Sequence, residues 1–167
     1  YINRELSWLE FNQRVLMQAS DAYHPLLERV KFVAIVGTNL DEFFMVRVAT
    51  ILKKFRAGVE DISPDGLTTG QQLTAIRERA RRMLEEQTAC WRSSLRPLLA
   101  GEGIVFLEPE SWVPEVEAWL AQYFKTEIHP VLTPLAFDPG HPFPYISNLS
   151  MNFAVVVRHG GRIKFAR

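Results

Sequence analysis

Apolar residues recur at intervals of three and four through the amino-terminal part of the chain, which is the spacing of one face of an α-helix. This pattern predicts helices at 7–20, 25–36, 40–54 and from 69 to at least 92. Ser7 and Glu10 have the spacing of a capping box, so we expect the first helix to begin there. Pro25 suits the start of the second helix, because a first-turn N–H has no intrahelical partner. The sequence therefore predicts an amino-terminal helical bundle.

A tight corner is predicted between the second and third of these helices. Gly37 suits the left-handed position that follows a helix C-terminus. Asn39 suits an N-cap, and Asn39 with Glu42 has capping-box spacing. Asp41 adds negative charge near the positive end of the helix dipole. Two interpretations of the corner stay open from these residues alone: a purely structural cap, and a polar site built on that cap.

The pattern changes after the glycines at 101 and 103. A short apolar strand is expected at 103–107, a helix from Ser111, an extended segment at 131–135 and a hairpin from 151 that turns at 159–161. The proline-rich stretch 138–144 fits neither a helix nor a central strand. We predict an α+β fold, with a helical domain at 1–102 and an incomplete mixed α/β domain at 103–167. The chain starts without methionine and ends in an apparent strand, so we expect it to be part of a longer protein.

Composition and charge exclude several classes of function. The 167 residues include 19 basic and 19 acidic side chains, and this zero net charge argues against a dedicated nucleic-acid binder. Cys90 is the single cysteine, so neither an intrachain disulfide nor a cysteine-based zinc site is possible. No stretch has the length and apolarity of a transmembrane helix. The arginines at 77–82 are interpreted as a solvated helix face, with an anion-binding patch as the weaker alternative.

Motifs of complete active sites are missing from the sequence. There is no Gly-x-x-x-x-Gly-Lys phosphate loop and no Gly-x-Gly-x-x-Gly. The four histidines have no metal-ligand spacing among them: His24, His129, His141 and His159. Taken alone, the residues indicate a helical domain joined to part of a second domain.

Several blocks of sequence resemble the histidine-phosphorylating family of polyphosphate kinases. They occur in the family's order at 2–16, 25–32, 39–48 and 141–150. The second and third blocks include Pro25-Leu26-Leu27-Glu28-Arg29-Val30-Lys31-Phe32 and Asn39-Leu40-Asp41-Glu42-Phe43-Phe44. Long blocks in register over most of the chain are far more specific than a single short motif.

This resemblance implies a function that the residues alone do not. The family transfers the terminal phosphate of ATP reversibly to inorganic polyphosphate through a phosphohistidine. The resemblance also implies an amino-terminal helical domain followed by the start of a head domain that is used for dimerisation. The catalytic histidine and the groups that bind phosphate and Mg²⁺ belong to later domains, so no catalytic residue and no metal ligand is expected here, and the chain alone is expected to be inactive.

The resemblance assigns one binding residue to this chain. The family's asparagine in the Asn-Leu-Asp-Glu-Phe block contacts ATP, and here it is Asn39. The implied partners are ATP, polyphosphate and a second copy of the protein, with no nucleic acid. The implied location is cytoplasmic, or peripheral to the inner face of the membrane. The alternative is a non-enzymatic helical interaction module in which Asn39 is only a cap.

Overall fold

The computed structural model describes residues 2–59, 61–137 and 145–167. The chain divides into two compact units, Tyr1–Phe106 and Leu107–Arg167, which we describe separately. The domain limits predicted from sequence, 1–102 and 103–167, stay a prediction. The expected α+β fold is confirmed: helices make up the first unit, and the second combines a helix with a small antiparallel sheet.

Helix α1 spans Arg4–Ser20 and begins earlier than the sequence predicts. Asn3 is its N-cap, and the Asn3 side chain accepts hydrogen bonds from the backbone N–H groups of Glu5 and Leu6. The predicted capping box at Ser7 and Glu10 is therefore wrong, because Ser7 already lies inside the helix and its N–H donates to the Asn3 carbonyl. Asn3 and Ser7 are both suitable capping residues and stand four positions apart. Capping at Asn3 adds about one turn to the helix.

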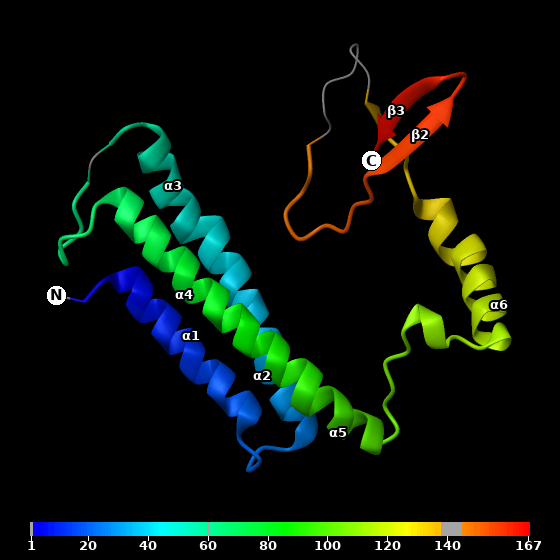
Figure 1. Ribbon diagram of the computed structural model, residues 1–167, viewed down its shortest axis with the longest axis horizontal. Helices are drawn as coiled ribbons and strands as arrows, with labels where there is room; N and C mark the ends of the chain where they lie inside the picture. Colours follow the sequence, from blue (N-terminus) through cyan, green and yellow to red (C-terminus); the bar gives the residue numbers. More distant parts are fainter. Residues whose placement is uncertain (1, 60, 138–144) are drawn as a thin grey trace. The chain divides into compact units, whose positions relative to one another are not determined.

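The predicted corner at Gly37 does not exist. Helix α2 (Leu26–Glu42), the π-helical turn η1 (Phe43–Val48) and helix α3 (Ala49–Arg56) follow one another without a break, as one long rod (Figure 1). Asn39 lies within α2 and caps nothing, and the Phe43 N–H donates to the carbonyls of Asn39 and Leu40. A glycine inside a helix costs only about 1 kcal/mol relative to alanine, so Gly37 alone does not end it when the continued helix buries apolar side chains.

The spacing of core residues gives a physical reason for the π-helical turn. Val36, Leu40 and Phe43 follow α-helical spacing, but the next core-facing residue, Val48, comes five positions after Phe43. A π turn closes hydrogen bonds between residues five apart, so it keeps Val48 on the face that packs against the core.

The third rod of the bundle consists of α4 (Thr69–Cys90), η2 (Trp91–Leu95) and α5 (Arg96–Gly101). Thr68 and Gln71 form a complete capping box at its start. The rod continues through Pro97, the second residue of α5. The π turn η2 directly precedes this proline, whose ring would clash with the carbonyl four residues earlier in a regular α-helix.

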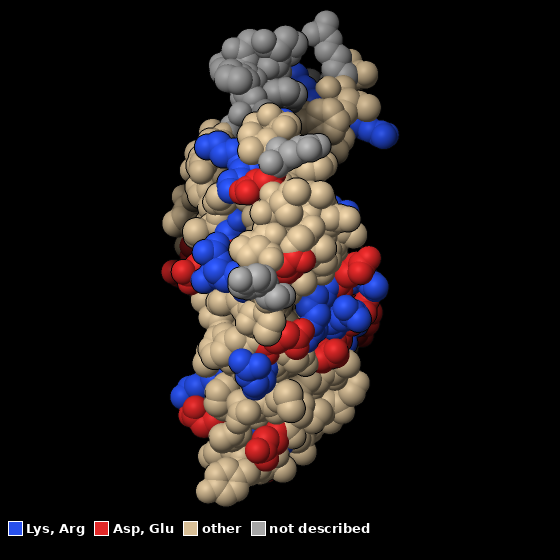
Figure 2. Space-filling model, turned by 90° about the vertical axis from the view of Figure 1, so that its left-hand side faces the viewer, with Lys and Arg blue, Asp and Glu red and all other residues tan. Residues whose placement is uncertain are grey.

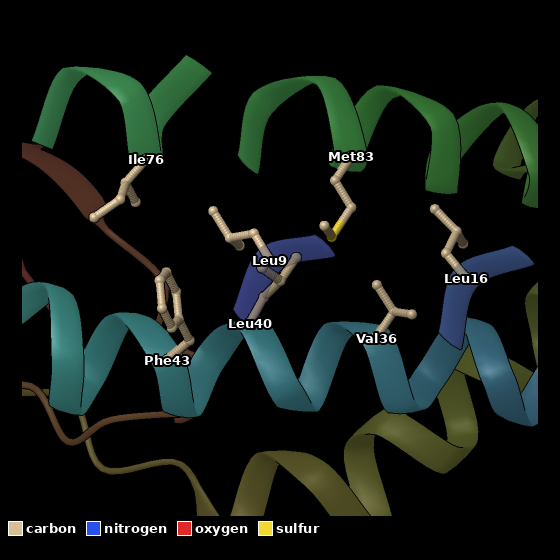
Figure 3. Packing of buried hydrophobic residues seen from close by; sticks show 7 residues of the cluster. All are labelled: Leu9, Leu16, Val36, Leu40, Phe43, Ile76 and Met83. Atoms are coloured by element: carbon tan, nitrogen blue, oxygen red, sulfur yellow. The ribbon is translucent and has the colours of Figure 1, made fainter. Parts of the chain in front are cut away.

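The core of the first unit lies between the rods. Helix α1 packs against both α2 and α4, and α3 packs against α4 (Figure 1). Side chains from α1, α2, η1 and α4 point toward one another in this core (Figure 3). The cluster comprises Leu9, Leu16, Val36, Leu40, Phe43, Ile76 and Met83, each at most 5% exposed. The apolar spacing that predicts the first and fourth helices thus marks side chains that are buried, namely Leu9, Leu16, Ile76 and Met83.

The second unit begins with an irregular segment and short helices. They are η3 (Pro109–Ser111), α6 (Pro114–Tyr123), η4 (Phe124–Ile128) and η5 (His129–Val131). No strand is assigned at 103–107 or 131–135 within the described residues, so the strand predicted at 103–107 is wrong. The proline-rich stretch 138–144 lies outside the described residues.

Three strands form an antiparallel sheet in the order β1 (Ala136–Phe137), β3 (Arg162–Ala166), β2 (Val155–His159). The predicted hairpin is confirmed, although β2 begins four residues later than expected. Gly160 and Gly161 form its turn with φ of 56° and 72°. Two consecutive positive φ angles match the hairpin turn whose twist suits paired strands, and they favour glycine.

The described side chains of 107–167 are exposed or half-buried, and none is fully buried. Large apolar side chains of the hairpin are exposed, among them Val156, Ile163 and Phe165. Within the described residues, no helix is long and apolar enough to cross a membrane.

Candidate functional site

Asn39 lies half-buried on α2, on the side that faces α1. Its Nδ2 donates a hydrogen bond to Oδ1 of Asn12 over 2.9 Å. The structure thus places the sequence-predicted site residue on a rigid helix within the bundle rather than at a helix end. Its side chain is held by tertiary contact with α1 and not by local capping.

Asn12 is a polar residue inside the core, with no exposed surface. Its Nδ2 donates to the Val36 carbonyl at 3.3 Å and lies 3.5 Å from the Met83 sulfur. A backbone carbonyl can only accept, so the amide nitrogen of Asn12 must face Val36 and its oxygen must face Asn39. Asn39 in turn must present its nitrogen to Asn12. The hydrogen-bond network therefore fixes both amide orientations.

The other end of the Asn39 amide is open. Among the described residues no donor reaches Asn39 Oδ1, and no buried side-chain oxygen or nitrogen lacks a partner, so this oxygen must be accessible to solvent. Glu42, one turn further along α2, is exposed. The predicted capping roles of Asp41 and Glu42 are wrong, since both lie within α2.

An aromatic and ionic cluster lies between the start of α1 and η1. The rings of Trp8 and Phe43 are stacked, with centroids 4.5 Å apart and planes 1° apart. The Arg47 guanidinium lies 5.9 Å from the Trp8 ring centroid, and Arg47 Nη1 donates to Glu5 Oε2 at 3.2 Å. Glu5 is only 5% exposed, and Arg4 Nη2 reaches its other oxygen at 2.7 Å. Two guanidinium partners offset the cost of burying this carboxylate.

Sequence reasoning missed Asn12 and Glu5. The available signal for Asn12 was its spacing. Asn12 stands three residues after Leu9 and four before Leu16, so it is a polar residue within the buried stripe of α1. Buried polar groups are hydrogen-bonded in folded proteins, so such a position predicts a specific partner. Nothing in the sequence identifies that partner as Asn39.

A cavity of about 480 Å³ opens where the start of α1, the η1–α3 segment and the 57–68 loop meet. Asn39 does not line it. Acidic and basic side chains on its wall pair with each other, as in Lys54–Asp61 at 2.6 Å and Arg47–Glu5 at 3.2 Å. The wall therefore has no excess of one charge that would select a phosphate chain.

The arginine run of α4 also takes part in ion pairs. Arg79 pairs with Glu10 of α1, and its Nη2 donates to Gln13 at 3.1 Å. Arg81 pairs with Glu85 one turn along the same helix at 2.6 Å. On the face drawn in Figure 2, positive and negative side chains are interspersed. These contacts support the interpretation of the run as a charged helix face.

The structure describes the contacts of two of the four histidines. His24 lies 3.1 Å from Gln18 Oε1, and the ring of His129 contacts Phe124. His141 lies outside the described residues, and the side chain of His159 is not described. Among the described residues, no group of three or more His, Cys, Asp or Glu side chains could hold a metal ion.

Comparisons with known proteins identify the family. Residues 1–107 match the polyphosphate kinase N-terminal domain, and residues 115–167 match the polyphosphate kinase middle domain. The polyphosphate kinase of Prosthecochloris aestuarii is 51% identical over 170 residues, which cover 100% of this chain and 24% of that protein. Polyphosphate kinase 1 of Chlorobaculum tepidum is 52% identical over 171 residues, again 100% of this chain and 24% of that protein.

A solved structure agrees with the sequence matches. The crystal structure of polyphosphate kinase from Porphyromonas gingivalis superposes with a TM-score of 0.74 at 30% identity, covering 98% of this chain and 24% of that one. The chain thus spans 24% of the length of these relatives. It belongs to the polyphosphate kinase family, of which it contains the amino-terminal helical domain and the start of the middle, or head, domain.

Proposed function

We propose that this chain is the nucleotide-positioning part of an enzyme that transfers the terminal phosphate of ATP reversibly to inorganic polyphosphate through a phosphohistidine. The proposal rests on membership of the family and on one structural observation. Asn39 presents a solvent-accessible amide oxygen from a rigid helix, with its amide orientation fixed from within the core. In this proposal the catalytic histidine and the ligands of Mg²⁺ lie outside the chain.

The site is suited to the uncharged end of a nucleotide. A neutral amide can hydrogen-bond a base or a sugar, but it cannot offset the charge of a triphosphate, which requires Arg, Lys, a metal ion or several backbone N–H groups. Exposed Glu42 stands one helical turn from Asn39 and would repel phosphates. Asn39 would therefore orient ATP, while phosphoryl transfer takes place on other domains.

The second unit would contribute to assembly. We propose that it forms part of the dimer contact, on the basis of its exposed apolar hairpin residues and the unpaired outer edge of β2 within the described sheet. The proposed location is the cytoplasm, or the inner face of the membrane as a peripheral protein. We also propose that the 167 residues alone have no kinase activity, which an assay for polymer synthesis with ATP and Mg²⁺ would test.

The central experiment compares Asn39→Ala with Thr38→Val in a full-length polyphosphate kinase that carries this segment. Thr38 is exposed and donates only to the Ala34 carbonyl of its own helix. Loss of one hydrogen bond to the nucleotide is worth roughly 0.5–1.5 kcal/mol, so the KM for ATP should rise by about 2- to 10-fold in Asn39→Ala. Thr38→Val should leave it unchanged. An unchanged KM for ATP in a folded Asn39→Ala enzyme would return Asn39 to a purely structural role.

A further inference from the structure

We infer that Asn12 is a positioning residue that makes Asn39 a hydrogen-bond acceptor toward the nucleotide. This inference rests on the proposed function of Asn39. It adds a second residue to the site and specifies the chemistry of the ligand group: an N–H or O–H donor on the base or the ribose.

The Val36 carbonyl can only accept a hydrogen bond. It requires the Asn12 nitrogen, at 3.3 Å, to face it. The Asn12 oxygen then faces Asn39 and accepts from Asn39 Nδ2 at 2.9 Å. A rotation of either amide by half a turn would bring two oxygens or two nitrogens together. Because Asn12 has no exposed surface, water cannot compensate for that mismatch.

The consequence appears at the free end of Asn39. Its nitrogen is committed to Asn12, and its oxygen is the atom that solvent reaches. A ligand group that approaches this oxygen must donate. Adenine offers such a donor in its exocyclic amino group, where guanine has an acceptor oxygen, and the ribose offers its hydroxyl groups.

Two substitutions of Asn12 separate its positioning role from its contribution to stability. Asn12→Leu removes the acceptor that holds Asn39, so the Asn39 amide is free to rotate. Asn12→Asp keeps an oxygen facing Asn39 and so keeps the orientation. A buried carboxyl group is poorly tolerated, whereas an apolar side chain of similar size suits the core beside Met83. The Leu variant should therefore be the more stable protein and the Asp variant the better binder of ATP.

The experiment measures thermal melting, kcat and the KM for ATP in a full-length enzyme carrying this segment. We expect Asn12→Leu to raise the KM by no more than the roughly 2- to 10-fold of Asn39→Ala, with little change in kcat, and Asn12→Asp to raise it less despite a lower melting temperature. A KM that follows the order of melting temperatures would overturn the inference. An unchanged KM in Asn12→Leu, beside a raised KM in Asn39→Ala, would overturn the inference while leaving the proposed function intact. An unchanged KM in Asn39→Ala would reject both.

Nucleotide analogues identify the donor. The 6-amino group is absent from purine riboside triphosphate, and single hydroxyl groups are absent from 2′-deoxyATP and 3′-deoxyATP. One of these analogues should have a higher KM than ATP in the unmodified enzyme but the same KM as ATP in the Asn39→Ala enzyme, because the acceptor for the missing donor is then gone. If the ratio of each analogue's KM to that of ATP is the same in Asn39→Ala as in the unmodified enzyme, Asn39 does not accept a hydrogen bond from the nucleotide.

Discussion

The indole ring of Trp8 lies flat against the phenyl ring of Phe43, with ring centroids 4.5 Å apart and an interplanar angle of 1°. The contact joins α1 to the first residue of the π turn and adds to the apolar core between the rods. Stacked aromatic pairs contribute about 0.5–1.5 kcal/mol beyond the area they bury.

A double-mutant cycle with Trp8→Leu and Phe43→Leu should therefore give a coupling energy of about 0.5–1.5 kcal/mol. Urea unfolding of the two single variants and the double variant measures it. A control cycle pairs Phe11→Leu with Phe43→Leu and should give no coupling energy. Phe11 is 49% exposed on α1 and has no ring contact with Phe43 among the described residues. Effects of Trp8→Leu and Phe43→Leu that simply add would contradict the stacked arrangement.

The start of α1 can be tested with two short polar residues. Asn3→Ala should lower the free energy of unfolding by about 1 kcal/mol, because Asn3 accepts from two backbone N–H groups at 3.0 and 3.1 Å. Ser7→Ala should change it by less than about 0.5 kcal/mol, since Ser7 is an exposed residue inside the helix. Chemical unfolding of both variants decides the point, and the reverse order of effects would restore the cap at Ser7.

Gly37 distinguishes a continuous rod from a corner. A methyl group there would stand 3.6 Å from Gln87 Nε2, an ordinary contact, and the backbone is helical. Gly37→Ala should therefore stabilise the protein by up to about 1 kcal/mol. Gly66 has a φ of 87°, so Gly66→Ala should destabilise by about 1–2 kcal/mol even though no atom lies within 4 Å of its added methyl. Destabilisation by Gly37→Ala would indicate a left-handed backbone at the predicted corner.

The ion pair between Glu10 and Arg79 should make stability depend on pH in the acid range. The hydrogen bond from Arg79 lowers the pKa of Glu10 below its ordinary value of 4.5. A lowered pKa in the folded protein means that the pair stabilises above about pH 4.5 and that this contribution is lost as the pH falls through the folded pKa. Glu10 is 54% exposed, so we expect less than about 1 kcal/mol.

Urea unfolding of Glu10→Gln and the unmodified chain from pH 7 to pH 3 measures this contribution. The difference between the two proteins should be largest near neutral pH and should vanish at the acid end. High salt should reduce it at pH 7, because exposed pairs are screened. A constant difference across the pH range would assign the effect to packing instead of charge.

The exposed face of the hairpin predicts self-association. Cross-strand partners share a face, so Val156 and Phe165 lie together, and Ile163 follows two residues from Phe165 on the same side. These side chains are 57%, 55% and 56% exposed. Phe165→Lys should lower the average mass in sedimentation at high concentration. Met17→Lys, at a 59% exposed site on α1, should leave it unchanged. A monomer at every concentration in the unmodified chain would contradict the prediction.

The sequence by itself determined the type and approximate extent of most helices, the inward residues of α1 and α4, the hairpin with its glycine turn, and the family. These features depend on local spacing or on single residues: apolar side chains three and four apart select a helix, and two adjacent glycines permit consecutive positive φ angles. The sequence also singled out Asn39, but the capping role that its position suggested is wrong.

Only the tertiary structure decided whether the chain turned at Gly37, and with which residue Asn39 was paired. Local signals of glycine and asparagine favour a corner by about 1 kcal/mol each. The buried stripe of Val36, Leu40 and Phe43 outweighs them, because each apolar side chain withdrawn from water contributes more than that. Asn12 and Asn39 are 27 positions apart, and their contact exists only because α1 packs against α2 in one register. That register, which no local pattern encodes, determines which end of the Asn39 amide faces solvent.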